Sequence, residues 1–219
     1  ERVRLSEERL KGIIELAHDG IVVIDEGHRI SLFNPAAERL FGYTALEAIV
    51  GFAIGTLVGT TLGLSLWYSE NVARIVEPFV IALNSVPKIA LAPLIILWFG
   101  TGYSAKIALV IAMTAIVALI TAYQAARDSD KDLQRLLASM GADKHRIFYK
   151  AVIPSSLPAV IATFRINIGF ALVGAVVGEY LGSAAGLGYL IQQAEGVFDV
   201  AGVFAGMFVL SAFVILIDM

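Results

Sequence analysis

Long stretches of this chain carry no charged residue and are long enough to cross a lipid bilayer. Residues 107–126 and 200–217 contain no Asp, Glu, Lys or Arg. An α-helix rises about 1.5 Å per residue, so each stretch can span a hydrocarbon core about 30 Å thick. Because a backbone inside that core must satisfy its own polar groups, helices are the favoured structure. We therefore predict an all-α polytopic membrane protein.

Composition supports this prediction and excludes several other classes of protein. The 219 residues are 58% hydrophobic and 16% charged, whereas a soluble domain has about 25% charged residues. The net charge of −3 argues against a nucleic-acid partner. Without cysteine, the chain has no disulfide, thiolate metal ligand or cysteine nucleophile. No residues have the spacing of a catalytic triad or a metal site, so we expect no catalytic group, metal or cofactor.

Five candidate spans follow from the apolar stretches: Ala48 to Tyr68, Val76 to Phe99, Ile107 to Ala126, the stretch after Pro154 and Pro158 to Leu181, and Val200 to Ile217. Three prolines, Pro78, Pro87 and Pro93, interrupt the second, which predicts either a kink or a break that lines a substrate path. A short helix or re-entrant turn through Leu190 follows the fourth. The first span has a glycine at every fourth position, which favours close helix packing: Gly51, Gly55, Gly59 and Gly63.

A charged loop over residues 127–150 separates the third and fourth spans. Six of its residues are Lys or Arg, so the positive-inside rule predicts that the loop is cytoplasmic. Apolar residues recur at helical spacing between Asp132 and Met140, which indicates a short amphipathic helix. Gly141 is expected to end this helix, and a second basic stretch follows it.

The first 48 residues differ from the rest, because they carry the entire net charge of −3. Residues 21–25 and 29–33 are predicted strands joined by a turn at residues 26–27. A helix is expected from Asn34–Pro35 through Phe41, with Gly42 as its stop. Since the chain begins with Glu1 and stops at Met219, we expect a fragment or a processed product with a truncated C-terminus.

The charged loop carries the most informative motif, "LLASMGADKHRIFYKAVIPSSLP". Gly141 is followed by nine residues and then by Ala151, Val152, Ile153 and Pro154. This spacing resembles the cytoplasmic signature loop of ABC importer permeases, which reads EAA, three residues, Gly, nine residues and I-x-L-P. The EAA positions depart from the pattern, because they hold Arg135, Leu136 and Leu137.

The flanks "SVPKIALAPLIILWFGTGYSAK" and "FRINIGFALVGAVVGEYLGSAAGLGYLI" resemble the permeases of nitrate, sulfonate and taurine importers. The resemblance covers residues 49–219 and implies a type I ABC permease domain in the bacterial plasma membrane. It further implies a homodimer embedded in membrane lipid, a separate ABC ATPase, and a periplasmic or lipoprotein substrate-binding protein. The chain has no phosphate-binding loop of its own, so we expect a transport subunit and not an enzyme.

The residues expected to couple this permease to its ATPase lie in and after the amphipathic helix: Leu133, Leu136, Leu137, Gly141, Ala142, Lys144, Arg146 and Pro154. A plain solvated loop is the alternative. Two charged residues of the fourth span are weaker candidates for the translocation pathway, because intramembrane charges are often functional. Arg165 could attract an anion or serve in pairing, and Glu179 could face the pathway, cap a helix or reach the interface.

Residues 1–48 resemble the opening half of a PAS sensor domain, through "SEERLKGIIELAHDGIVVIDEGHRISLFNPAAERLFGYTALEAIVG". The later strands and the ligand-pocket wall of that α+β fold are absent, so we interpret the head as a truncated PAS-like segment in an unusual fusion. It stands where the permease family normally has another span. Two alternatives remain open: a membrane-bound PAS signalling protein, and a fusion without activity.

Overall fold

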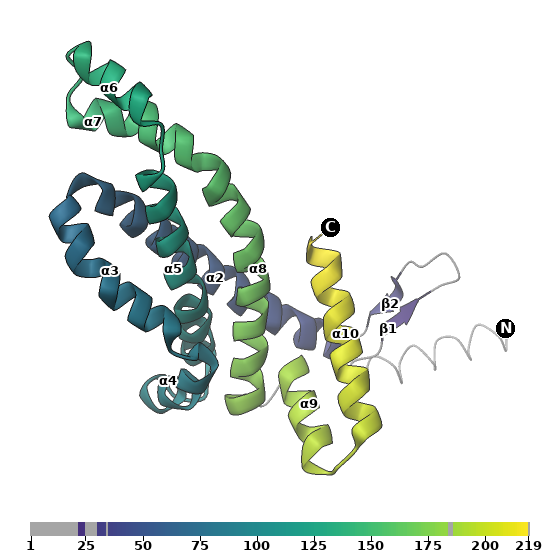
Figure 1. The fold of residues 1–219 in the computed structure, drawn as a ribbon. Coiled ribbons are helices and arrows are strands. Elements are labelled where there is room, and N and C mark those ends of the chain that lie inside the picture. The colour runs from purple at the N-terminus through teal and green to yellow at the C-terminus, as the bar shows by residue number, and fades with distance from the viewer. Residues whose placement is uncertain (1–21, 25–29, 34, 184–185, 219) are drawn as a thin grey trace, which may run out of the picture.

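The computed structural model describes residues 22–24, 30–33, 35–183 and 186–218 (Figure 1). Two short strands come first: β1 (Val22–Ile24) and β2 (Ile30–Phe33). They pair antiparallel, with Val22 opposite Phe33 and an irregular register between Val23 and Ile24. The two predicted strands are confirmed, while the predicted turn at residues 26–27 lies outside the described residues.

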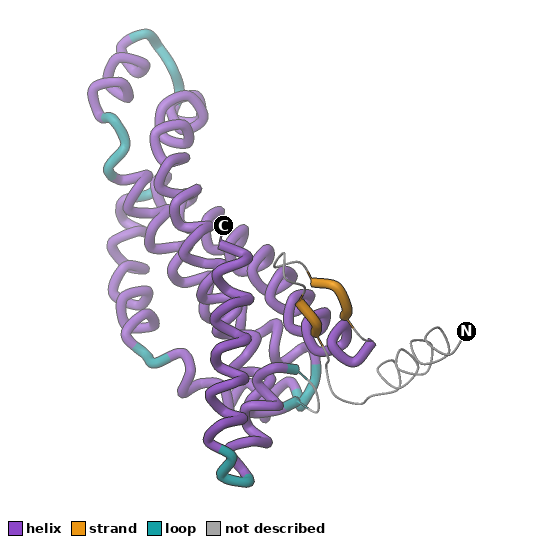
Figure 2. Tube along the Cα trace, turned by 90° about the vertical axis from the view of Figure 1, so that its right-hand side faces the viewer, coloured by secondary structure: helices purple, strands orange, loops and turns teal. Residues whose placement is uncertain are grey.

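Helices joined by short loops make up the rest of the described chain, as Figure 2 shows. In chain order they are α2 (Pro35–Ser65), the short 3-10 helix η1 (Leu66–Tyr68), α3 (Glu70–Ser85), the 3-10 helix η2 (Lys88–Leu91), α4 (Ala92–Phe99), α5 (Tyr103–Arg127), α6 (Lys131–Ser139), α7 (Lys144–Ile147), the π-helical turn η3 (Phe148–Val152), α8 (Ile153–Gly182), α9 (Leu187–Gly196) and α10 (Val200–Asp218). The predicted all-α membrane fold is confirmed.

Three described helices are long and apolar enough to cross a membrane: Leu46–Tyr68, Tyr103–Arg127 and Lys144–Gly182. A fourth span is formed if Glu70–Ser85 and Lys88–Phe99 count as one, although they are bent by 83° at a short break. The break lies at Val86 and Pro87, where the backbone becomes extended, because a residue before proline avoids the helical conformation. The last predicted span corresponds to α10, whose described apolar part, Val200–Ala212, is shorter than a full span, so three to four of the five predicted spans are found among the described residues.

Two predicted helix boundaries are wrong. Gly42 does not stop a helix, since α2 runs uninterrupted from Pro35 to Ser65; an interior glycine costs only about 1 kcal/mol, which a long helix can absorb. The fourth span also begins earlier than predicted, because α8 starts at Ile153, before both of its prolines. Pro154 lies at the start of α8, directly after the π-helical turn η3, and Pro158 lies inside the helix.

The core is a three-helix body of α2, α5 and α8, with α9 and α10 against its end (Figure 1). The glycine stripe explains how closely α2 and α5 approach. A Cβ at Gly51 would lie 2.5 Å from that of Val110, and one at Gly59 would overlap the carbonyl oxygen of Ala115. The predicted packing role of these glycines is therefore confirmed.

Candidate functional site

Helix α6 and helix α7 project beyond the ends of the other helices in both views (Figures 1 and 2). Asp130 caps α6, because its carboxylate accepts hydrogen bonds from the backbone amides of Asp132 and Leu133, at 2.9 and 3.0 Å. The turn from α5 is held by the Ser129 hydroxyl, which donates to Ala126 O and binds the Gln134 amide. The amphipathic helix predicted from the sequence is therefore formed and firmly attached to α5.

The apolar side chains of α6 are unusually accessible for their type. Leu136 is 57% exposed and Met140 75% exposed, while Leu133 is exposed and Leu137 half-buried. A single exposed leucine is common on a protein surface. Several exposed apolar side chains on one short helix indicate a site that binds another protein.

Gly141 ends α6 in a Schellman motif. Its φ is +83°, its amide donates to Ala138 O at 3.0 Å, and the amide of Ala142 donates to Leu137 O at 3.0 Å. Only glycine adopts this left-handed backbone without strain. The predicted stop at Gly141 is confirmed.

Gly141→Ala is expected to loosen this turn, although nothing lies within 4 Å of the added Cβ. The left-handed conformation costs an alanine about 1 kcal/mol or more, so the amides of residues 141 and 142 should exchange about fivefold faster with deuterium. Hydrogen-exchange mass spectrometry of this segment measures the change. Gly102→Ala is the matched control, because Gly102 is also open to space and its φ is −147°; equal exchange in both variants would contradict the strain argument.

Helix α7 is attached to the end of α2 by polar and aromatic contacts. The Lys144 amine donates to Tyr68 O at 2.6 Å and lies 5.6 Å from the centre of the Trp67 ring. The Tyr68 hydroxyl forms a 3.0 Å hydrogen bond with His145 Nδ1, and its ring lies 4.6 Å from that of Phe148. Lys144 therefore serves a contact within the chain, besides any contact with a partner.

From α7 onward the chain forms one continuous rod. The π-helical turn η3 joins α7 to α8 without a break, so a single helical segment extends from Lys144 to Gly182. Arg146 is exposed on α7, 3.8 Å from Asp143, and Pro154 is exposed in the first turn of α8. Six of the predicted coupling residues thus lie on α6, its end and the start of α7, with Arg146 beside them and Pro154 further along the rod.

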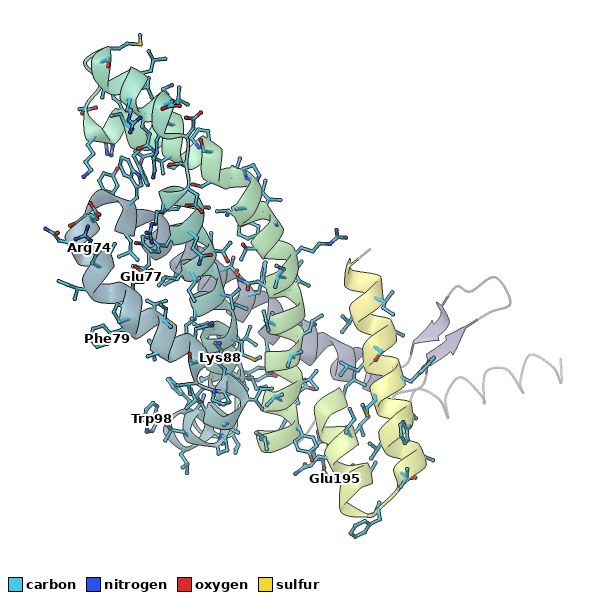
Figure 3. All side chains as sticks on the ribbon, viewed as in Figure 1. Arg74, Glu77, Phe79, Lys88, Trp98 and Glu195 are labelled. Carbon is cyan, nitrogen blue, oxygen red and sulfur yellow. The ribbon has the colours of Figure 1, made fainter. Side chains whose placement is uncertain are left out.

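The two predicted pathway residues lie apart from that end. Arg165 is exposed near the middle of α8, and Glu179 is buried near its end. The Glu179 carboxylate accepts a 3.1 Å hydrogen bond from the amide of Gly188, which caps the N-terminus of α9. Gly186, with φ +111°, packs directly against that carboxylate, where a Cβ would overlap it. The Tyr180 hydroxyl donates to Glu195, labelled in Figure 3, and adds a second tie between α8 and α9.

Sequence reasoning missed a buried ion pair between α2 and α5. Lys106 Nζ lies 2.9 Å from Glu47 Oε1, and both side chains are almost completely buried. Glu47 Oε2 has no hydrogen-bond partner in the described part of the chain. The available signal was a lone Lys at the edge of the third predicted span, but its partner Glu47 lies in the PAS-like segment of residues 1–48.

A second buried polar cluster ties all three core helices together. Asn167 of α8 donates to the hydroxyl of Thr56 on α2 at 3.0 Å and to the carbonyl of Thr114 on α5 at 3.2 Å. An amide in an otherwise apolar helix was the signal that could have identified it. Among the described residues, no group of three or more His, Cys, Asp or Glu could hold a metal ion.

Comparison with known families gives two matches along the chain. Residues 51–219 match the family described as "Binding-protein-dependent transport system inner membrane component". Residues 8–73 match the PAS domain family, and this match covers all of α2 and η1 and the first turn of α3.

Several curated permease proteins are similar to this chain over much of its length. A formylaminopyrimidine transport permease protein of Halalkalibacterium halodurans is 36% identical over 180 residues, 80% of this chain and 72% of the relative. An aliphatic sulfonates transport permease protein of Bacillus subtilis is 30% identical over 78% of this chain and 63% of the relative. A riboflavin transport system permease protein of Chloroflexus aurantiacus is 33% identical over 64% of this chain and 51% of the relative.

The fold resembles a solved chain of the MetNI methionine ABC transporter in inward-facing conformations. The TM-score is 0.70 at 22% sequence identity, over 82% of this chain and 90% of that chain. A likeness at this identity concerns the fold alone.

Proposed function

We propose a transport mechanism from the premise that this chain belongs to the family of binding-protein-dependent transport system inner membrane components. It is a permease of the ABC importer type and a multi-pass protein of the bacterial plasma membrane. Such permeases work with an ATPase and a substrate-binding protein, so the chain has the role of a transport subunit. The proposal concerns how this chain couples to the ATPase, what it moves and how it is assembled.

The observation that carries the coupling proposal is the set of exposed apolar side chains on α6. Leu133, Leu136 and Leu137 stand on a helix whose two ends are capped by Asp130 and Gly141. A rigid, capped helix loses little conformational entropy when it docks, which favours insertion into a groove on the ATPase. Ala142, Lys144 and Arg146 extend the proposed surface, and Pro154 begins the rod behind it.

The same contacts suggest how closure of the ATPase would reach the membrane. A displacement of α6 acts on α5 through the Ser129 and Gln134 hydrogen bonds. A displacement of α7 acts on α8 through the continuous rod from Lys144 to Gly182. At the far end of that rod, Glu179 holds α9. We infer that motion of this rod changes access to the pathway from one side of the membrane to the other.

The transported compound is proposed to be a small solute of the size handled by the relatives, such as nitrate, a sulfonate, taurine or a small heterocycle. Arg165 remains a proposed contact for an anionic solute. Glu179 is proposed to act by positioning α9 beside the pathway. Two copies of the permease domain, residues 49–219, would form the dimer, with the PAS-like segment of residues 1–48 as an additional head.

A double substitution tests the coupling proposal. Leu133→Asp/Leu136→Asp is expected to lower ATP-dependent solute uptake at least tenfold in vesicles containing the permease, ATPase and binding protein, because two charges cannot enter an apolar groove. Co-purification of the ATPase should fall in parallel. Ser139→Asp adds charge to the same helix outside the proposed surface and should retain both. Full uptake by the double variant would contradict coupling through α6, while loss in the control as well would point to α6 folding instead.

A further inference from the structure

A large cavity opens beneath α6 at the cytoplasmic end of the molecule. Its volume is about 740 Å³, and it lies between η1, α3, α5, α6 and α7. Figure 3 labels two of its residues, Arg74 and Glu77, on the part of α3 nearer to α6 and α7. None of the residues in the proposed coupling surface lines it apart from Lys144.

Basic side chains dominate the charge of this cavity. Five line it, against two acidic ones, Glu70 and Glu77: Arg74, Arg127, Lys131, Arg135 and Lys144. Each acidic residue is matched by one arginine, Glu70 by Arg74 at 2.7 Å and Glu77 by Arg127 at 3.7 Å. Of the three remaining cations, Arg135 lies 3.4 Å from Asp132, which is outside the lining, and Lys144 donates to Tyr68 O. The lining residues together still carry an excess of positive charge, which favours an anionic occupant.

A narrower apolar groove leads away from the basic cavity. It has a volume of about 100 Å³ and shares four residues with the cavity: Leu66, Glu77, Tyr123 and Arg127. Beyond these it is lined by one polar residue, Gln124, and by apolar residues of α3 and α5 that lie toward the middle of the membrane: Val80, Ile81, Leu119 and Ile120. The combined site is therefore charged at the cytoplasmic surface and apolar within the membrane.

We propose that this combined site binds an anionic phospholipid of the inner leaflet. The phosphate group occupies the basic cavity, near Lys131 and Arg135, and part of one acyl chain enters the groove between α3 and α5. Basic pockets on the cytoplasmic side of transmembrane helices recognise anionic headgroups in this way. The groove is the feature that favours a lipid over a soluble phosphate, which has no acyl chain to bury.

A lipid bound in this site would connect the short cytoplasmic helices to the transmembrane helices. Its basic residues come from α3, α5, α6 and α7, so one headgroup contacts the short helices and the transmembrane helices together. A lipid held there stabilises the arrangement of α6 relative to α3 and α5, in addition to the contacts within the chain.

Lipid retention by the purified full chain tests this proposal. Native mass spectrometry after addition of phosphatidylglycerol is expected to show a bound lipid, with weaker retention of phosphatidylcholine. Lys131→Gln should weaken retention of phosphatidylglycerol about fivefold, which corresponds to about 1 kcal/mol for one basic residue at a membrane surface. Arg74→Gln/Lys131→Gln should weaken it by more than tenfold. Lys150→Gln removes a charge from the same loop but not from the cavity, and should retain the lipid.

A groove variant distinguishes the lipid from other anions. Val80→Trp fills the apolar groove and leaves every basic residue in place, so it should reduce lipid retention while any binding of inorganic phosphate stays unchanged. If phosphate binds as well as the lipid and Val80→Trp has no effect, the site takes a soluble anion and the lipid proposal is wrong. Unchanged lipid retention with loss of ATPase binding in Arg74→Gln/Lys131→Gln would assign the cavity to the ATPase.

Discussion

Lys106→Met is expected to destabilise the protein by about 3–5 kcal/mol, since it leaves a buried carboxylate without its cation. Glu47 is completely buried, and Lys106 is its ion-pair partner at 2.9 Å. The second carboxylate oxygen has no hydrogen-bond partner in the described part of the chain, so little else compensates the charge. Unfolding in mixed micelles with increasing SDS, followed by circular dichroism, measures the loss.

Replacing both Glu47 and Lys106 distinguishes the effect of the unpaired charge on stability from the effect of side-chain packing. Glu47→Leu/Lys106→Met removes the unpaired charge and keeps side chains of similar size, so its stability should return to within about 1–2 kcal/mol of the original. A double variant as unstable as Lys106→Met would show that the lysine stem, which packs against Gly178, matters more than the ion pair.

Gly59→Leu is expected to have a comparable effect, because it separates α2 from α5. A Cβ at Gly59 would overlap the carbonyl oxygen of Ala115 and lie 2.8 Å from the Cβ of Ala118. The obstacle is backbone, which cannot rotate away, so the two helices must move apart and lose their close packing. We expect a loss of about 3 kcal/mol or more, at the upper end of the range for overpacked cores, measured by the same unfolding assay.

Gly169→Leu is the matched control for this substitution. Gly169 also lies inside a membrane-spanning helix, α8, but nothing lies within 4 Å of its Cβ position. Leucine has a better helix propensity than glycine, so the control should be neutral or slightly stabilising. Equal losses from both substitutions would mean that glycine is needed for a reason other than the close approach of α2 and α5.

Features encoded by neighbouring residues were predictable from the sequence. The charge-free stretch over residues 107–126 lies within α5, because a bilayer demands a long apolar helix whatever surrounds it. The amphipathic spacing of Leu133, Leu136 and Leu137 predicted α6, and the glycine after it marked the end of that helix. In each case the residues that determine the structure are close to one another in the sequence.

The wrong boundaries arise where a local rule competes with a longer helix. Gly42 is a weak helix breaker, and its cost is small compared with the many hydrogen bonds of a helix of 31 residues. The helix-breaking tendency of Pro154 and Pro158 predicts a span that starts after them, whereas α8 begins at Ile153 and contains both. The 83° bend at Val86 and Pro87 could be anticipated as a break, but its angle depends on what the two halves contact.

Features that join distant segments were not predictable. Glu47 and Lys106 are 59 residues apart, and Asn167 and Thr56 are 111 apart. Neither the spacing nor the composition of one segment identifies such partners. The basic cavity has the same origin, because five separate elements must assemble before Arg74 and Lys131 line one space. The charged loop was predictable from the sequence, but the open cavity beneath it was not.

The Glu47–Lys106 ion pair also ties the region that matches the transport family to a residue that precedes it in the chain. The match to the transport family starts at Gly51, yet the lysine inside that region finds its counter-ion four residues earlier. A chain that began at Gly51 would therefore keep Lys106 buried without its counter-ion, which is costly in an apolar interior. An excised permease domain should begin before Glu47 if it is to retain this ion pair.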